Sequence, residues 1–432
     1  MKEGNFKIIL IVVFMALAIF GVMVFSGMIK IGSNKNEAGA LGTVIIWGTE
    51  KSQNLAQAMD DFNKVNPTFI VKYVQKYPET FDQDLLEALA TGTGPDMFFL
   101  LDDLAFKYSN KIYTIPYTSY PLATFKNNFA RAGEVFLTGK GMLAFPMTID
   151  PLVMYYNRST LDANNIVYPP TTWDQFQSLV LVITKKDNAN KIIKSTVAMG
   201  QFSNVFHAKD ILATLFMQVG NPIVSEKDGT FFSALDTSSA KYDLGSILTF
   251  YTDFTNPLKD VYSWNKSLPN SLDAFSSENL AFYFGYASEL TSLVSRNPNQ
   301  NFLAAPMPQI KNANTKLTYA HVVGIAISSF SKNFNTAFTA ASLMATGDFA
   351  GKYAKAIGAV PARRDLLAVK QTDAFSPIFY SSALFGASWL DPSTSDTDNI
   401  FRNMIDSVLS NNMTADEAVR DSSGKLNILL VK

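Results

Sequence analysis

The residues best suited to catalysis are few, and none lies in a catalytic motif. The chain has two histidines, His207 and His321, and no cysteine. Neither histidine is close to a nucleophile motif, and the patterns HExxH, GxSxG, GxxxxGK(S/T) and GxGxxG are absent from the sequence. Without cysteine there is no disulfide, thiol nucleophile, thiolate zinc site or lipid-modified N-terminal cysteine. We therefore expect a protein that is not an enzyme and that holds no metal or other cofactor.

Two pairs of adjacent aspartates, Asp60-Asp61 and Asp102-Asp103, could in principle supply acid and base groups. Neighbouring residues do not by themselves form an acid/base pair, and the first pair falls on the solvated face of a predicted helix. The stretch Thr91-Gly92-Thr93-Gly94 resembles a phosphate-binding loop, but it follows a helix rather than a strand, which favours a helix C-cap. The second aspartate pair directly follows an apolar run, and its position therefore depends on the elements around it.

Those elements begin with an alternation of strands and helices. Asn66-Pro67 ends the first predicted helix, and a capping box of Thr80 and Gln83 opens the second. The predicted strands cover 43–47, 69–75 and 97–101, with helices over about 55–65 and 80–91 between them. This series is typical of a doubly wound parallel sheet, in which the loops at Trp47–Lys51 and Leu100–Asp103 share one edge of a ligand crevice.

A second alternation follows in the middle of the chain, and the last third is mostly helical. Predicted helices cover 173–182, 210–219 and 242–254, predicted strands cover 280–285, 302–305 and 322–327, and later amphipathic helices cover 334–344, 400–409 and 415–420. A chain of 432 residues exceeds what one core usually supports, so we expect two lobes. A net charge of -1 offers no basic excess for a phosphate backbone, so we expect no nucleic-acid partner.

The N-terminal segment Ile8–Ile29 carries no charged residue and is about 22 residues long, enough to cross a hydrocarbon core at roughly 1.5 Å per residue. We expect a cytoplasmic tip and an uncleaved membrane anchor over residues 1–30, then a flexible linker over 31–42. A cleaved signal peptide is the alternative, with Ala38-Gly39-Ala40 as the nearest cleavage-like site. Because lysines flank the apolar run on both sides, the positive-inside rule does not fix its orientation.

An ordered set of segments between residues 43 and 432 carries a family resemblance. The segments are Val44-Ile45-Ile46-Trp47-Gly48, Thr91-Gly92-Thr93-Gly94-Pro95-Asp96, Gly139–Pro146 followed by Tyr155-Tyr156-Asn157, Pro170–Phe176, Phe275–Phe282, Ala305-Pro306-Met307-Pro308 and Gly358–Arg364. In this order they resemble the extracellular solute-binding proteins of ABC importers, of the maltose-binding-protein-like kind. The chain departs from that family at Asn279, where a glycine is common, and in having an anchor helix instead of a lipoprotein cysteine or a cleaved signal.

This resemblance implies an α/β, two-lobed periplasmic-binding-protein-like fold, in which each lobe is a doubly wound sheet flanked by helices. It places residues 41–148 and 309–358 in the first lobe, and residues 149–308 and 359–432 in the second. Hinge strands would join the lobes, which would close on a ligand held between them. The resemblance also implies a body outside the cytoplasm, at the cell surface or in the periplasm, and a monomer that works with the permease subunits of an ABC importer.

A sugar presents hydroxyl groups around its rim and apolar C–H faces, so its site needs aromatic platforms together with carboxylates and amides. Thr49 and Glu50 follow the first predicted strand and are candidate ligand residues of the first lobe. Trp47, at the end of the same strand, is either a platform or a buried residue.

Two carboxylates match positions at which sugar-binding relatives contact their ligand. Asp103 follows the third predicted strand, although Asp102 could take its place, since a shift of one residue reverses the direction of a side chain. Asp150 lies just past the predicted crossover into the second lobe. An Asp103–Asp150 acid/base pair would make the chain a membrane-anchored hydrolase, but the absence of catalytic motifs disfavours that alternative.

The resemblance also indicates candidates in the second lobe. Tyr286 ends a predicted strand where relatives carry a stacking aromatic residue, and His207 precedes a helix in a loop that relatives use. Trp389 lies in an apolar-to-polar loop and could either cap the crevice or pack in the core. His321 and Trp264 are further alternatives.

The function that these features indicate is a membrane-tethered binding protein that delivers a sugar or oligosaccharide to an ABC importer. One alternative is a surface receptor or adhesion protein of the same fold that serves no permease. Another is a binder of a non-sugar solute such as a polyol, a peptide, a metal chelate or a phosphate ester. A phosphate ester would need a basic crevice, for which the sequence offers only Lys51 and Arg363 nearby.

Overall fold

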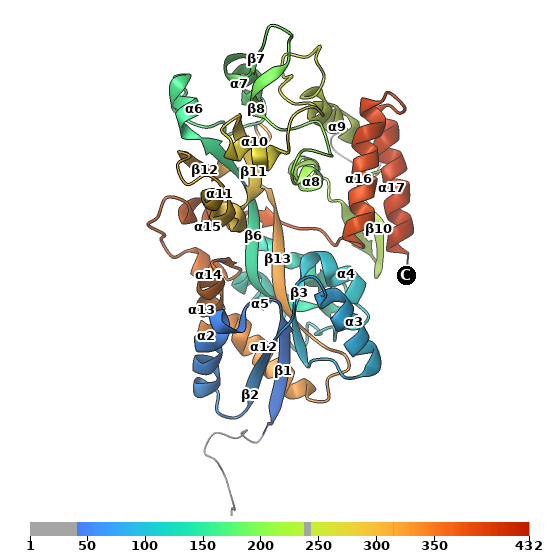
Figure 1. The fold of residues 1–432 in the computed structure, drawn as a ribbon. Coiled ribbons are helices and arrows are strands. Elements are labelled where there is room, and N and C mark those ends of the chain that lie inside the picture. The colour runs from blue at the N-terminus through green and yellow to red at the C-terminus, as the bar shows by residue number, and fades with distance from the viewer. Residues whose placement is uncertain (1–40, 237–242, 314, 432) are drawn as a thin grey trace, which may run out of the picture.

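The computed structural model describes residues 41–236, 243–313 and 315–431. Figure 1 shows an elongated molecule with two lobes, which are joined by the long strands β6 (Ala144–Asn157) and β13 (Thr318–Ile327). We call the part that contains the N-terminal strands the first lobe and the other part the second lobe. The lobe boundaries predicted from the sequence stay predictions, because β6 and β13 run through both parts.

The first lobe is built on the predicted alternation of strands and helices. The strands β1 (Thr43–Gly48), β2 (Ile70–Gln75) and β3 (Met97–Leu101) are parallel, in the order β2-β1-β3. The helices α2 (Ser52–Val65) and α3 (Phe81–Thr91) connect them. These strands confirm the predicted parallel unit at the N-terminal end of the body.

The two ends of α3 give opposite outcomes for the sequence analysis. The helix ends at Gly92, whose left-handed φ of 69° confirms the predicted C-cap. At the other end, the side chain of Thr80 caps no backbone N–H, and Gln83 Nε2 instead donates to Glu87 Oε1 at 2.9 Å. The predicted capping box is therefore wrong, because Gln83 pairs forward along the helix rather than back toward its start.

In the described part of the chain, the main sheet is a mixed sheet of eleven strands rather than a separate parallel sheet in each lobe. β13 is antiparallel to both β3 and β6, with Val323 opposite Leu101 and His321 opposite Asp150. β6 is 14 residues long and buried over nearly its whole length, so it extends far enough to pair with strands in both lobes. The expectation of a doubly wound sheet in each lobe holds for β1, β2 and β3 and is wrong for the rest.

In the second lobe, the strands next to β6 are antiparallel to it, and a parallel pair lies one strand further out. β11 (Leu280–Tyr286) and β12 (Phe302–Pro306) are antiparallel to β6, whereas β8 (Ile192–Val197) is parallel to β11. The hairpin of β9 (Val224–Lys227) and β10 (Thr230–Ser233) stands apart from this sheet. Such pairing leaves the second lobe without the repeated parallel crossovers that the sequence pattern suggested.

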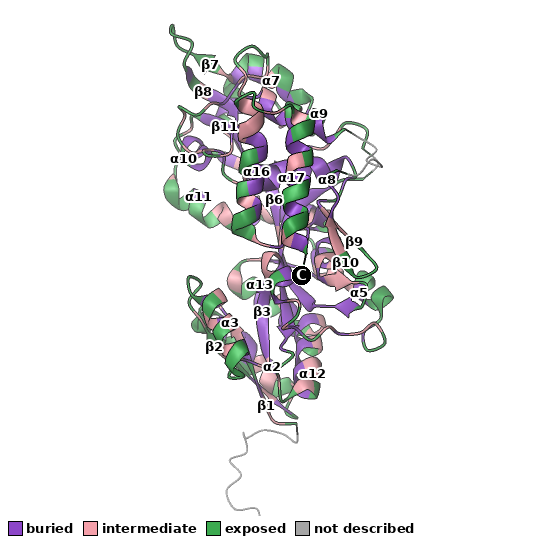
Figure 2. Cartoon of the chain, turned by 90° about the vertical axis from the view of Figure 1, so that its right-hand side faces the viewer, coloured by how far each residue is buried: buried purple, intermediate pink, exposed green. Residues whose placement is uncertain are grey.

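Helices cover both lobes, and the last two lie side by side. Figure 2 shows that α16 (Thr394–Leu409) and α17 (Ala415–Leu430) present exposed outer faces, while the strands behind them are buried. The other helices are α4 (Ala105–Tyr108), α5 (Leu122–Asn128), α6 (Arg158–Ala163), α7 (Gln175–Ile183), α8 (Ala208–Gln218), α9 (Leu244–Asp253), α10 (Ser271–Ser276), α11 (Leu290–Arg296), α12 (Phe334–Thr346), α13 (Asp348–Ile357), α14 (Arg364–Leu367) and α15 (Ser376–Leu384). The short elements are the 3-10 helices η1 (Asp102–Leu104), η2 (Arg131–Phe136) and η3 (Ala287–Glu289) and the strands β4 (Leu137–Thr138), β5 (Gly141–Met142), β7 (Lys185–Lys186), β14 (Val360–Pro361) and β15 (Gly386–Ala387).

The predicted anchor, Ile8–Ile29, and nearly all of the predicted linker lie outside the described residues. Of the helices in the described part of the chain, none has the length and apolar character needed to cross a membrane. The first described strand, β1, starts at the end of the first lobe that is farthest from the second lobe, as Figure 1 shows.

Candidate functional site

A cavity of about 450 Å³ lies where the two lobes meet, and we call it the histidine cavity. The end of β3 leads into Asp103, and β13 supplies Tyr319 and His321. The segments around the starts of α8 and α16 supply the other charged and aromatic side chains and one hydroxyl, that of Thr394; the charged and aromatic ones are Phe202, Phe206, His207, Lys209, Asp210, Asp391 and Asp398. Residues from distant parts of the sequence thus share one concave surface, the usual form of a small-molecule site.

An ion pair between His321 and Asp102 supports one wall of this cavity. His321 Nδ1 lies 3.1 Å from Asp102 Oδ1, and the N–H of Val322 donates to the same oxygen at 3.2 Å. The other oxygen of Asp102 accepts the hydroxyl of Ser388. Burial alone would lower the pKa of His321, but Asp102 and other nearby carboxylates raise it to about 10, so the imidazole is positively charged near neutral pH.

Asp103 lines the histidine cavity, whereas the side chain of Asp102 is fully buried behind it. The hydroxyl of Thr394 donates to Asp103 Oδ2 at 3.3 Å. Asp103 Oδ1 has no hydrogen-bond partner within the described part of the chain. Burial, with the charge of Asp102 next to it, raises the pKa of Asp103 to about 6. The structure therefore gives Asp102 the ion pair and leaves Asp103 with an unused acceptor.

His207 comes to the same cavity from the second lobe. It immediately precedes α8 with a φ of 60°, which turns the chain into the helix. His207 Nε2 lies 2.6 Å from Glu289 Oε1. Burial would raise the pKa of Glu289, but the hydrogen bond and charge of His207 lower it overall, so this carboxylate stays ionised.

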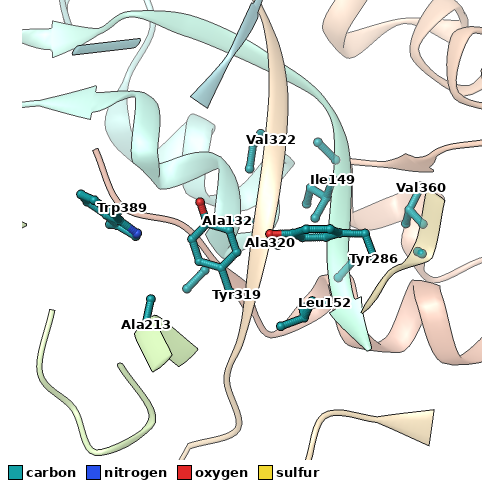
Figure 3. Close-up of a cluster of buried hydrophobic side chains, with 14 of the residues drawn as sticks. Ala132, Ile149, Leu152, Ala213, Tyr286, Tyr319, Ala320, Val322, Val360 and Trp389 are labelled. Atoms are coloured by element: carbon teal, nitrogen blue, oxygen red, sulfur yellow. The ribbon is translucent and has the colours of Figure 1, made fainter. Parts of the chain in front are cut away.

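Tyr286 packs behind the cavity rather than on its surface. Its ring centroid lies 4.7 Å from that of His207 and 4.9 Å from that of His321, and its side chain is buried. Figure 3 shows Tyr319 between Trp389 and Tyr286 in this region. The Tyr286 hydroxyl donates to Asp210 Oδ2 at 2.8 Å, which positions that carboxylate.

Lys209 is a buried cation next to His207, and its charge is neutralised by two aspartates of the second lobe. Lys209 Nζ lies 3.1 Å from Asp391 Oδ2 and 2.7 Å from Asp398 Oδ1. Burial would lower the pKa of Lys209, but Asp391 and the other carboxylates around it raise the pKa overall. The ammonium is therefore held in an ion network, and its charge is already balanced before any ligand arrives.

Asp150 lies beside the cavity, opposite His321 in the register of β6 and β13. Its Oδ1 accepts the N–H of Ser288 at 3.0 Å, and burial raises its pKa. Asp150 is not one of the described residues that line the histidine cavity. Its predicted contact with a ligand therefore stays a prediction.

The candidates at the end of β1, which are Trp47, Thr49 and Glu50, are not among the described residues that line this cavity. Lys76 Nζ lies 3.8 Å from the centroid of the Trp47 ring. Tyr73 donates its hydroxyl to the carbonyl of Glu50 at 2.6 Å, and burial raises the pKa of Glu50. The strand order explains this placement, because β3 lies between β1 and β13 and so separates the end of β1 from the cavity.

Trp389 lines a second cavity of about 420 Å³, which we call the tryptophan cavity. Its ring is buried against Phe401, and its Nε1 has no hydrogen-bond partner among the described residues. Arg131 from the first lobe and Glu226 from the second also line this cavity. Trp264 is fully buried. The structure thus separates Trp389 from the histidine cavity.

Several cavity residues were not predicted from the sequence, namely Lys209, Asp210, Tyr319 and Asp391. A signal existed for the first two, because a lysine and an aspartate stand at the start of a largely apolar helix. The pairing of Lys209 with Asp391 joins residues 182 positions apart, and no local pattern reports such a contact. Within the described residues, no group of three or more His, Cys, Asp or Glu side chains could hold a metal ion.

Solved structures with the same fold include several sugar-binding proteins. A cyclo/maltodextrin-binding protein in complex with maltotetraose has a TM-score of 0.71 and 16% identity, with 92% of this chain and 98% of the other covered. MalE from *Listeria monocytogenes* in complex with maltose has a TM-score of 0.69, 16% identity and coverages of 90% and 97%. The sugar-binding protein MalE from *Xanthomonas citri* has a TM-score of 0.69, 15% identity and the same coverages. At such low identity these likenesses establish the two-lobed fold.

The sequence itself provides the family. No curated protein matches the chain. The family model for bacterial extracellular solute-binding proteins matches residues 47–346, which is more than half of the chain. The chain therefore belongs to the bacterial extracellular solute-binding protein family.

Proposed function

We propose that this protein binds a sugar or oligosaccharide in the histidine cavity and delivers it to an ABC importer. The observation that carries the proposal is the cavity itself, of about 450 Å³, which combines carboxylates with aromatic rings where the lobes meet. Carboxylates accept hydrogen bonds from sugar hydroxyls, and aromatic rings cover the apolar faces of a sugar ring. The sugars bound by the structural neighbours support the same choice of ligand.

Closure of the lobes would couple binding to transport. Thr394 at the start of α16 already reaches Asp103 at the end of β3, so the two lobes touch at the cavity. A solute that contacts both sides stabilises the arrangement in which they are close, and so shifts the population toward it. The permease would then recognise this closed form.

We propose Asp103 and His207 as direct ligand contacts, because both line the cavity. Tyr286 and Asp150 would act from behind, by holding Asp210 and by facing His321 across the sheet. The other predicted contacts, Trp47, Thr49, Glu50 and Trp389, lie elsewhere and would reach a solute only if it extended beyond this cavity.

The place of work would be outside the cytoplasm, as the family description supports. We propose that the apolar segment Ile8–Ile29 tethers the body to the membrane as a monomer, beside its transporter. N-terminal sequencing of the native protein tests the tether. A sequence that begins at Met1 agrees with an anchor, and one that begins near Leu41 would mean a removed signal.

A thermal-shift screen tests the ligand class. The full chain, kept in a detergent without a sugar headgroup, is heated with a panel of sugars, polyols, peptides and phosphate esters. A solute that binds only the folded state raises the melting temperature. At a free concentration of 100 times its Kd, it adds about 2.7 kcal/mol to the free energy of unfolding. We expect a shift with a saccharide. A shift with a different class and with no saccharide would contradict the proposal.

A further inference from the structure

The charges around the histidine cavity do not balance. Among the described residues that line it, each one that can carry a positive charge has a carboxylate partner: the ion pairs are His321–Asp102 at 3.1 Å, His207–Glu289 at 2.6 Å, Lys209–Asp391 at 3.1 Å and Lys209–Asp398 at 2.7 Å. Arg402 stacks on the lining residue Phe202, with its Cζ 5.0 Å from the ring centroid, but does not itself line the cavity. Two further aspartates, Asp103 and Asp210, line the same cavity. The cavity wall therefore holds more carboxylates than cations.

Asp103 and Asp210 each have an oxygen that is still unused. Asp103 Oδ1 and Asp210 Oδ1 are both buried and without a hydrogen-bond partner in the described residues. The other oxygen of Asp103 accepts from Thr394, and that of Asp210 accepts from Tyr286. His207 Nδ1 lies 3.8 Å from Asp210 Oδ2 while its other nitrogen is bound to Glu289, and the charges of Lys209 and His321 also act on Asp210.

A buried carboxylate without a balancing charge is unfavourable, and a neutral hydroxyl compensates it only in part. A ligand with a positively charged N–H group both donates a hydrogen bond to the unused carboxylate oxygen and balances the negative charge of that carboxylate. Two carboxylates are enough to accept the N–H groups of an organic ammonium, whereas no group of three or more His, Cys, Asp or Glu side chains in the described residues could hold a metal ion. The ring of Phe206, which is 40% exposed, adds a face on which an ammonium group is stabilised.

We propose that the solute of this site is a saccharide bearing a protonated amine, which Asp103 and Asp210 accept. This inference rests on the proposed sugar-binding function and narrows it to one substrate class. Anionic sugars, such as sugar phosphates and uronic acids, are disfavoured because Lys209 and both histidines are already paired with carboxylates. Neutral sugars leave the excess negative charge uncompensated.

Calorimetric titration of the full chain with matched pairs of sugars tests the inference. Each amino sugar or amino-oligosaccharide is compared with its N-acetylated form, which keeps the ring and removes the charge. We expect the amino form to bind at least about tenfold more tightly, the gain typical of a charge-assisted hydrogen bond over a neutral one. A simple amine without a sugar ring is included as a probe of charge alone.

The outcomes separate this inference from the proposed function. Equal or tighter binding of the N-acetylated forms would overturn the charge preference and leave sugar binding intact. Binding of the simple amine with no saccharide bound would overturn the sugar assignment, and with it the amino-sugar inference. Failure of every saccharide, while another solute class binds, would overturn both.

Variants that remove one charge locate the effect. Asp210→Asn and Asp103→Asn each keep the shape of the side chain, and each should reduce the preference for the amino form by about tenfold. Asp273→Asn is the matched control, since this exposed aspartate pairs with Arg296 on the surface of the second lobe. Melting curves establish that each variant is folded, and if Asp210→Asn is not, Asp103→Asn decides the question. An unchanged preference in a folded Asp103→Asn variant would overturn the inference.

Discussion

The two cavities between the lobes are similar in size and different in chemistry. The histidine cavity has a volume of about 450 Å³ and the tryptophan cavity about 420 Å³. Carboxylates and imidazoles dominate the wall of the first, whereas the second is lined largely by aliphatic side chains and Trp389. Volume therefore does not distinguish the two cavities, and each has a buried polar atom without a partner in the described residues. The unused acceptors of the histidine cavity belong to carboxylates, which suit sugar hydroxyls, and this favours it as the binding site.

The two cavities are also connected through a short chain of contacts. Ser388 lines the tryptophan cavity and donates its hydroxyl to Asp102. Asp102 in turn holds His321, which lines the histidine cavity. The effect of a substitution on solute affinity can therefore be compared between the two cavities. A different effect in each would show that the two cavities have different roles.

The largest difference is expected for ligand affinity. Asp103→Ala removes the unused carboxylate of the histidine cavity, and we expect the affinity for the bound solute to fall by roughly tenfold to a hundredfold. Arg131→Ala in the tryptophan cavity should change it by less than about threefold. Calorimetric titration measures both. Equal losses in the two variants would remove the distinction between the cavities.

The next effect concerns stability and its dependence on pH. The pKa of His321 is raised from 6.5 to about 10 in the folded protein, so its contribution is fully present below pH 6.5 and is lost as the pH rises toward 10. His321→Gln leaves the buried Asp102 without its cation and should lower the free energy of unfolding by about 1–3 kcal/mol near pH 6. Denaturant unfolding at pH 6 and pH 10 measures the difference between the two proteins. A difference in unfolding free energy that was larger at pH 10 than at pH 6 would contradict this prediction.

A smaller effect is expected for the pH dependence of binding. Asp103, with a pKa of about 6, loses its negative charge as the pH falls through that value, while His321 stays charged. The affinity for a cationic solute should therefore fall by at most about tenfold between pH 7 and pH 5. Asp103→Asn should be nearly independent of pH over this range. A wild-type affinity that rose on acidification would be inconsistent with a charged Asp103 in the site.

The smallest effect is expected at the rim of the tryptophan cavity. Both oxygens of Glu226 accept the N–H of Gly139, at 3.1 and 3.0 Å, and so tie the β9–β10 hairpin to the turn between β4 and β5. Glu226→Gln keeps an acceptor and removes the charge, so solute affinity should fall by only roughly twofold to fivefold, through weaker closure. Titration under the same conditions measures this change. A loss of solute affinity as large as that of Asp103→Ala would mean that the solute binds at the tryptophan cavity rather than at the histidine cavity.

How far the sequence predicts the site depends on whether a residue is positioned by its own strand or by a distant one. The structure places Asp103 at the histidine cavity because it directly follows β3, the neighbour of β13, while its contact with a ligand stays a prediction. Glu50 follows β1 in the same way but is not among the described residues that line the cavity, because β3 lies between β1 and β13. The sequence pattern did not contain this spatial order of the strands. Local spacing in the sequence therefore identifies the ends of strands, but it does not predict which of those ends border the cavity.

The fold was predicted in part for a similar reason. The parallel unit of β1, β2 and β3 follows from local alternation of strands and helices. The long strands β6 and β13, which turn the sheet into a mixed one shared by both lobes, pair segments more than 160 residues apart. No periodicity within either segment carries that information.

A structure of the chain with its saccharide bound is the most direct test of the account. We expect the sugar in the histidine cavity, with Asp103 Oδ1 and His207 within hydrogen-bonding distance of it and the tryptophan cavity without sugar. A sugar bound against Trp389 and Arg131 instead, with Asp103 untouched, would contradict the central claim.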